Sequence, residues 1–171
     1  MDETCPSLQA AENAADRDRI RSRVIQALRE ANHDEGSVDL DGSFVLDTED
    51  GELRIPIELI VRVDRRPALL VKCVRGHLST RERASVSLAR LLAEHPVPFA
   101  IVANERDAVV IDAMTGKAVG QGYGAFPRPE ALRQRLEECA DLAVPPAQRE
   151  RERRILAAYY HLRCSVDREP F

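Results

Sequence analysis

The chain lacks an excess of charge of one sign and a closely spaced pair of cysteines. Its 25 basic and 29 acidic residues leave a formal net charge of -4. This balance gives no global signature of nucleic-acid binding, so any basic surface must be local. The four cysteines are far apart, which argues against a zinc site and a disulfide framework (Cys5, Cys73, Cys139 and Cys164). We expect Cys73, Cys139 and Cys164 to be small buried hydrophobic residues.

Long apolar runs are also missing. No run approaches the roughly 20 residues that a membrane-spanning helix needs. The polar and acidic start Met1–Thr4 has no basic region followed by an apolar one. We therefore expect no membrane association and a cytoplasmic location. At 171 residues the chain is long enough for one domain with a real core.

The pattern divides the chain into three parts. Residues 1–15 are small, polar and acidic, without apolar periodicity, and we predict a disordered tail. Residues 16–126 are predicted to form an α/β domain, and residues 127–171 a C-terminal helical segment. The α/β domain is expected to open with a helix that Asp16 caps and that ends near Asn32.

The first predicted helix is rich in arginine. Its apolar residues recur at helical spacing, and arginines occupy most of the remaining surface (Arg17, Arg19, Arg21, Arg23 and Arg29). A solvated helix face is one interpretation. The other is a face that contacts phosphates, for which Arg17 and Arg21, with Arg75 further along, are the candidate nucleic-acid-binding residues.

The most informative stretch consists of two segments rich in Ile and Val, residues 54–64 and residues 68–76, separated by a basic turn with a proline. They predict an antiparallel strand pair. Glu58 interrupts the first apolar run and Lys72 the second. Burying an unpaired charge is very costly, so each of these side chains is expected to snorkel to water, to pair or to lie in a functional cleft. Alternatively, both sit exposed at strand ends and have no function.

Acidic residues are concentrated in the segment before this strand pair, residues 38–51. Their spacing is similar to that of a calcium loop, but Phe44 stands where such a loop requires glycine. We therefore predict a hairpin whose acidic turn is Thr48–Gly51.

The next segments predict a strand–helix–strand crossover followed by a hairpin. Ser79 and Glu82 form a capping-box pattern for a helix ending near Glu94. A nearly continuous apolar run follows at residues 98–103, as in a strand covered on both faces, and residues 108–112 form the next strand. The glycine-rich residues 120–124 do not open a helix directly after a core strand, so we interpret them as a flexible exit and not as a phosphate loop.

The C-terminal segment predicts two helices, residues 128–142 and residues 147–164. The charged turn Arg149–Arg154 mixes both signs, which favours a solvated face over an RNA-binding arm. Apolar residues then share one stripe (Ile155, Tyr159 and Leu162). We predict that this stripe docks on the domain itself or on a second copy, while the charged turn stays in water.

The order of these elements over residues 17–120 is similar to that of the N-terminal nuclease domain of type I restriction enzyme R subunits, a family with small stand-alone members. Residues 69–74 (Leu-Leu-Val-Lys-Cys-Val) and residues 97–104 carry most of the resemblance, together with Asp112 and the Thr-Gly-Lys of residues 115–117. The resemblance implies a restriction-endonuclease-like, three-layer α/β domain with a mixed central sheet, to which the C-terminal helices are added.

The resemblance also implies an active site of the PD-(D/E)XK kind, in which two carboxylates hold magnesium and a lysine activates water. In this chain the Asp position falls on Glu58, the Glu position on Lys72 and the Lys position on Val74. Ser87 and Leu91 replace a glutamine and its aromatic companion found in active relatives. A single carboxylate does not hold a catalytic magnesium ion, and Lys72 places a positive charge where the cation would sit.

We therefore expect a catalytically degenerate pseudoenzyme that acts as a DNA- or RNA-binding or scaffold module, without a cofactor. Glu58 and Lys72 are then the remnant of the catalytic site. Because both replace catalytic residues on adjacent strands, we predict that they point to the same side of the sheet and pair. One alternative is a magnesium-dependent DNA endonuclease with a rearranged site, where Asp47 or Glu52 joins Glu58 as a metal ligand and Lys72 is the catalytic lysine. Another is an interaction protein that forms a homodimer through its last helix and binds no nucleic acid.

Overall fold

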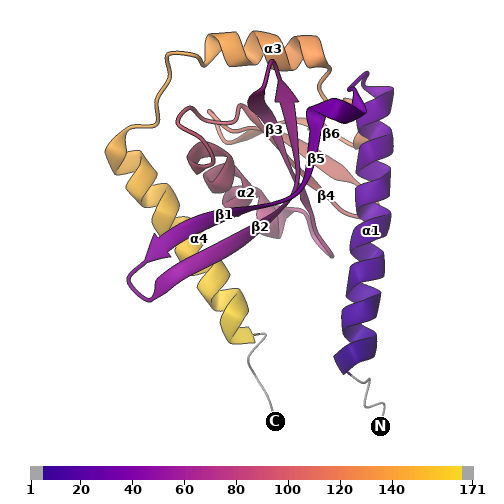
Figure 1. The fold of residues 1–171 in the computed structure, drawn as a ribbon, viewed down its shortest axis with the longest axis vertical. Coiled ribbons are helices and arrows are strands. Elements are labelled where there is room, and N and C mark those ends of the chain that lie inside the picture. The colour runs from indigo at the N-terminus through magenta and orange to yellow at the C-terminus, as the bar shows by residue number, and fades with distance from the viewer. Residues whose placement is uncertain (1–5, 167–171) are drawn as a thin grey trace.

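The computed structural model describes residues 6–166 and has an α/β fold built on one six-stranded mixed sheet (Figure 1). The strands lie in the sheet in the order in which they occur in the chain: β1 (Val38–Thr48), β2 (Gly51–Val63), β3 (Arg66–Cys73), β4 (Phe99–Ala103), β5 (Ala108–Asp112) and β6 (Lys117–Gln121). All neighbouring pairs are antiparallel except β3 and β4, which are parallel. Parallel neighbours need a crossover connection, and helix α2 (Ser79–Leu91) supplies it.

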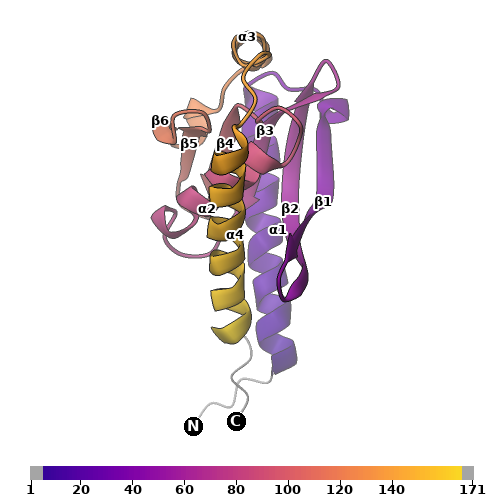
Figure 2. The ribbon, with the colours of Figure 1, turned by 90° about the vertical axis from the view of Figure 1, so that its left-hand side faces the viewer.

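Helices cover both faces of the sheet, which gives three layers. Helix α1 (Pro6–Glu30) and helix α3 (Pro129–Glu138) bury Ile20, Leu28 and Leu132 on one face. Helix α2 and helix α4 (Pro146–Val166) bury Leu88 and Leu156 on the other. Figure 2 shows α1 and α4 on opposite sides of the sheet.

The predicted hairpins are confirmed. β1 pairs with β2 across the turn at Thr48 and Gly51, and β2 pairs with β3. The second turn lies one residue earlier than its sequence suggested, at Asp64 and Arg65, whose φ angles are 51° and 67°. Two left-handed residues match the twist of the flanking strands in a tight hairpin, so Arg66 and Pro67 already belong to β3.

The prediction for the first helix was wrong at its start. Helix α1 begins at Pro6, ten residues before Asp16, and so includes most of the segment assigned to a disordered tail. Four alanines in residues 10–15 favour this extension, because alanine has the highest helix propensity.

Helix α2 starts as predicted, but Ser79 is not its cap. Ser79 is the first helical residue, Leu78 holds the cap position, and no side chain caps the helix. Every residue from Ala84 to Leu91 is buried, beyond the single predicted stripe, because the sheet lies on one side of α2 and α4 on the other.

The segment interpreted as a flexible exit, residues 120–124, has regular structure instead, and its first two residues belong to β6. Residues Tyr123–Ala125 form a 3-10 turn, and the rings of Tyr123 and Phe126 lie 5.6 Å apart. A Cβ atom on Gly120 would lie 2.9 Å from the Cβ of Ala125, so only glycine allows this close approach.

Helix α4 docks on its own domain, as one of the two predicted arrangements requires. Among its described side chains, Leu156 and Glu152 are fully inaccessible, whereas Ile155 is only half-buried. The prediction that the charged turn stays in water was therefore wrong for Glu152. The side chain of Leu162 lies outside the described part of the chain, and dimerisation through α4 stays a prediction.

Candidate functional site

Glu58 on β2 and Lys72 on β3 lie beside each other on the face that α2 and α4 cover. The register pairs Leu59 with Val71, so the next positions along the two strands, those of Glu58 and Lys72, are also opposed. Lys72 Nζ lies 2.8 Å from Glu58 Oε2, and the two side chains are only 10% and 9% exposed. The predicted pair is confirmed, and the alternative of two exposed strand ends is wrong.

The ammonium group of Lys72 has a second partner. Its Nζ donates a hydrogen bond of 2.5 Å to the carbonyl oxygen of Pro56. Glu58 Oε2 is buried and accepts no well-aligned hydrogen bond in the described structure, although Lys72 is close. The contact with Glu58 is therefore an ion pair, while the Lys72 ammonium group directs its hydrogen bond mainly at the backbone. The pair contributes little net stability, because both charged groups lose their hydration on burial.

The pair lines a cavity of about 280 Å3 between α1, the strands β2 and β3, and the helices α2 and α4. Four basic side chains line this cavity (Arg17, Lys72, Arg75 and Arg81), and Glu58 is the one carboxylate among the described residues that line it. Two tyrosines of α4 complete the wall (Tyr159 and Tyr160). We call this the basic cavity. Its lining groups carry a clear positive excess, which the balanced charge of the whole chain conceals.

Two of the three candidate nucleic-acid-binding arginines line the basic cavity. Arg17 is exposed, and Arg75 is held by an ion pair of 3.1 Å with Asp16. Arg21 does not line it, because its guanidinium is hydrogen-bonded to Asp41 on β1. That hydrogen bond raises the pKa of Arg21 and fixes its side chain against the sheet edge.

Arg81 and Tyr159 were missed from the sequence. The Arg81 guanidinium lies 5.0 Å from the centre of the Tyr159 ring, in cation–π range. The two residues come from different helices, α2 and α4, so only the packing of these helices brings them together. Helical spacing alone gave no signal for this contact.

The other proposed site residues lie elsewhere. Asp47 faces Glu52 in the hairpin register, and Glu52 precedes Glu58 by six residues. At about 3.3 Å per residue this places both acids roughly 20 Å from the pair along the strand. Val74 lines the basic cavity, whereas Ser87 hydrogen-bonds to Glu152 on α4. Among the described residues, no three His, Cys, Asp or Glu side chains are grouped to hold a metal ion.

Cys73 follows Lys72 and also lines the basic cavity, but its thiol is a buried, inert group. Burial raises the pKa of Cys73 to about 12, and the charge of Glu58 adds to this effect. The thiol therefore stays protonated at neutral pH. This confirms the expectation of a small buried hydrophobic residue, and Cys139 is buried in the same way.

Comparison of the chain with models of known protein families, with curated proteins and with solved structures yields no match. Within residues 6–166, none of the helices combines the length and the apolar character that crossing a membrane requires.

Proposed function

We propose that this chain is a catalytically degenerate, restriction-endonuclease-like domain that binds nucleic acid at the basic cavity and does not cleave it. The observation that carries the proposal is the buried Glu58–Lys72 pair inside a cavity lined by three further basic side chains. A concave, locally basic surface on a chain of balanced charge suits a polyanion that is bound at one place.

The fold supports the first half of the proposal. One helix, an antiparallel three-stranded meander, a crossover helix and a parallel fourth strand follow one another from α1 to β4. This is the order on which the resemblance to the R-subunit nuclease domain rests. Glu58 and Lys72 lie on the second and third strands, where the resemblance puts the catalytic residues. One fold can host many functions, so the proposal rests on the chemistry of the cavity.

The chemistry of the cavity speaks against catalysis. Magnesium prefers several carboxylate or water oxygens around it. Here the carboxylate of Glu58 lies 2.8 Å from the ammonium group of Lys72. The ammonium group repels a metal cation and is itself the counter-ion of the carboxylate. The residues present do not fit a magnesium site.

Binding is attributed to two exposed arginines that line the cavity. Arg17 belongs to α1 and Arg75 to the segment after β3, and their side chains are accessible enough to reach a phosphate backbone. Contacts to phosphates position a nucleic acid without reading its sequence. The proposed binding is therefore electrostatic, tolerant of sequence and sensitive to salt.

The test is a titration of the protein into short fluorescent DNA and RNA, single-stranded and duplex, read by anisotropy at several salt concentrations without divalent metal. Each phosphate contact contributes about -0.9 to the slope of log K against log salt for duplex DNA. The double variant Arg17→Gln/Arg75→Gln should bind more weakly, with a slope about two units shallower.

The matched control is Arg66→Gln. Arg66 is also an exposed arginine, but it begins β3 at the end opposite to Lys72, and it does not line the basic cavity. This variant should bind like the wild type. Equal losses in the control and in the double variant would place binding elsewhere, and no binding to any of the probes would refute the proposal.

A further inference from the structure

A second basic site surrounds the buried carboxylate of Glu152 on α4, away from the basic cavity. Arg83 Nη2 lies 2.7 Å from Glu152 Oε2, and Arg90 Nη1 lies 2.6 Å from Oε1. Arg151, the preceding residue on α4, places Nη2 4.0 Å from the same Oε1. Three guanidinium groups thus share one carboxylate, and the cluster keeps a positive excess.

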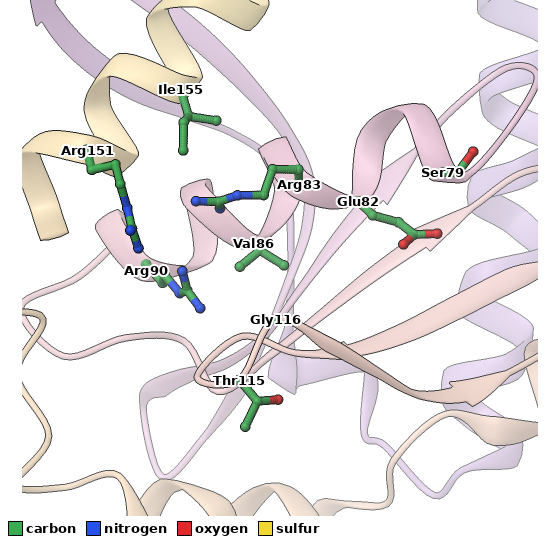
Figure 3. Close-up of a pocket in the computed structure, with 9 residues that line it drawn as sticks. All are labelled: Ser79, Glu82, Arg83, Val86, Arg90, Thr115, Gly116, Arg151 and Ile155. Carbon is green, nitrogen blue, oxygen red and sulfur yellow. The ribbon is translucent and has the colours of Figure 1, made fainter.

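These arginines line a cavity of about 680 Å3 between α2, α4 and the turn at Thr115 and Gly116. Figure 3 shows the guanidinium groups of Arg83, Arg90 and Arg151 gathered on one side of the cavity, while Glu82 points away from them. The volume is in the range of small-molecule sites. We call this the arginine cavity.

The three arginines differ in how many of their hydrogen-bond donors are free to bind a ligand. The donors of Arg90 hold the fold together: its side chain is 9% exposed, and it donates hydrogen bonds to Glu152 and to the carbonyl oxygens of Ala113 and Met114. Arg83 donates to Ser87 and Glu152 from a side chain that is 47% exposed. Arg90 therefore supplies charge from the wall, whereas part of Arg83 faces the opening.

Arg151 is the least committed of the three. Its side chain is 66% exposed, and its closest carboxylate atom within the described chain is the Glu152 oxygen at 4.0 Å. Two guanidinium groups with donors to spare, held near a third that is fixed, match the planar, forked recognition of an oxyanion.

We propose that the arginine cavity binds the phosphate group of a small phosphorylated molecule through Arg83 and Arg151. Val86 and Ile155 lie beside the arginines in the same cavity and offer apolar contact to the body of the ligand. The volume leaves room for more than a free phosphate ion. This inference does not rest on the function proposed for the basic cavity.

The test is isothermal titration of the full chain with inorganic phosphate, with adenosine monophosphate and with adenosine, at constant ionic strength in chloride. Phosphate and the monophosphate should bind saturably with one site, the monophosphate more tightly, and adenosine should not bind. Arg151→Gln should raise the dissociation constants of phosphate and of the monophosphate by about tenfold or more, because a charge-assisted contact is lost. Arg154→Gln is the matched control, since Arg154 is a 79% exposed arginine of the same helix that pairs with Glu150.

Three outcomes would overturn the inference. The first is no saturable binding of either phosphate ligand by the wild type, which would leave the cluster a purely structural clamp. The second is equal affinity in Arg151→Gln and Arg154→Gln. The third is DNA binding that is lost in Arg151→Gln but kept in Arg17→Gln/Arg75→Gln, which would make this surface a nucleic-acid contact and refute the function proposed for the basic cavity as well.

Discussion

Removal of the Glu152 carboxylate is the sharpest test of how helix α4 is held. Glu152 is fully buried and accepts hydrogen bonds of 2.6 Å from both Ser87 and Arg90, besides its contact with Arg83. In Glu152→Ala these bonds are lost, and the buried Arg90 keeps its charge without a carboxylate partner. Arg83 can turn to water, because its side chain is about half exposed.

The expected cost follows from this difference between the two arginines. Breaking a buried ion pair by deleting one partner costs about 3–5 kcal/mol, because the remaining charge stays buried. Only Arg90 meets that condition, so we expect a single penalty of this size for Glu152→Ala. For a chain of this length it corresponds to a fall in Tm of roughly 6–20 °C. Arg83→Ala should cost about 1 kcal/mol or less, as for a half-exposed pair.

The assay is urea denaturation followed by circular dichroism, with the free energy of unfolding taken from the midpoint and slope. Burial acts to raise the pKa of Glu152, but the hydrogen bonds that it accepts outweigh this effect and lower the pKa below its usual value of 4.5. The stabilisation is therefore present above pH 4.5 and is lost as the pH falls through the depressed pKa. Glu152→Gln should be less stable at neutral pH and should lose less stability on acidification. A loss below about 1 kcal/mol in Glu152→Ala would refute the reasoning.

Three further outcomes are expected. Lys72→Met should destabilise the fold by about 3 kcal/mol in the same assay, whereas Glu58→Leu/Lys72→Met should recover most of the loss; equal stability of the two variants would contradict a coupled pair. Removal of residues 147–171 should lower the free energy of unfolding by at least about 2 kcal/mol, because Leu156 is fully buried. If the truncated protein kept both its stability and its oligomeric mass in solution, α4 would be a free arm. Alkylation of Cys73 should be slow in the folded state at pH 8, because its pKa is raised to about 12. Burial of the protonated Cys73 thiol adds stability that is complete below the unfolded pKa near 9 and is lost as the pH rises towards 12. Fast alkylation of Cys73 itself in the folded protein at pH 8, located by peptide mass mapping, would contradict the buried thiol.

Much of the fold could be predicted because it depends on short-range patterns. Alternating and continuous apolar runs, turn residues and prolines placed five of the six strands and the crossover helix near their observed bounds, whereas β6 was missed because its last residues were assigned to a flexible exit. The Glu58–Lys72 pair was predicted from the resemblance, which places both residues at catalytic positions on adjacent strands, and the register of the short hairpin explains why the two are opposed. The start of α1 was missed, because the segment before Asp16 has no apolar stripe and depends on alanine propensity instead.

The positions missed in the sites depend on contacts between distant segments. Glu152 lies within a run of charges, and its burial follows only from the packing of α4 on α2 beside Arg83 and Arg90. Arg81 meets Tyr159 in the same way. A helix pattern shows which face is apolar, but a carboxylate that is buried by partners on another helix leaves no periodic signal.

The central claim is that the basic cavity binds nucleic acid and leaves it intact. One measurement tests both parts: a labelled DNA duplex is titrated with the protein in magnesium and then in manganese, read by anisotropy, and its strand length is then measured on a denaturing gel. We predict a saturable rise in anisotropy, lost in Arg17→Gln/Arg75→Gln and kept in Arg66→Gln, with every strand at full length. Strand cleavage that needs the metal and disappears in Glu58→Ala would contradict the account and establish an endonuclease with a rearranged site, and a flat titration would contradict the binding.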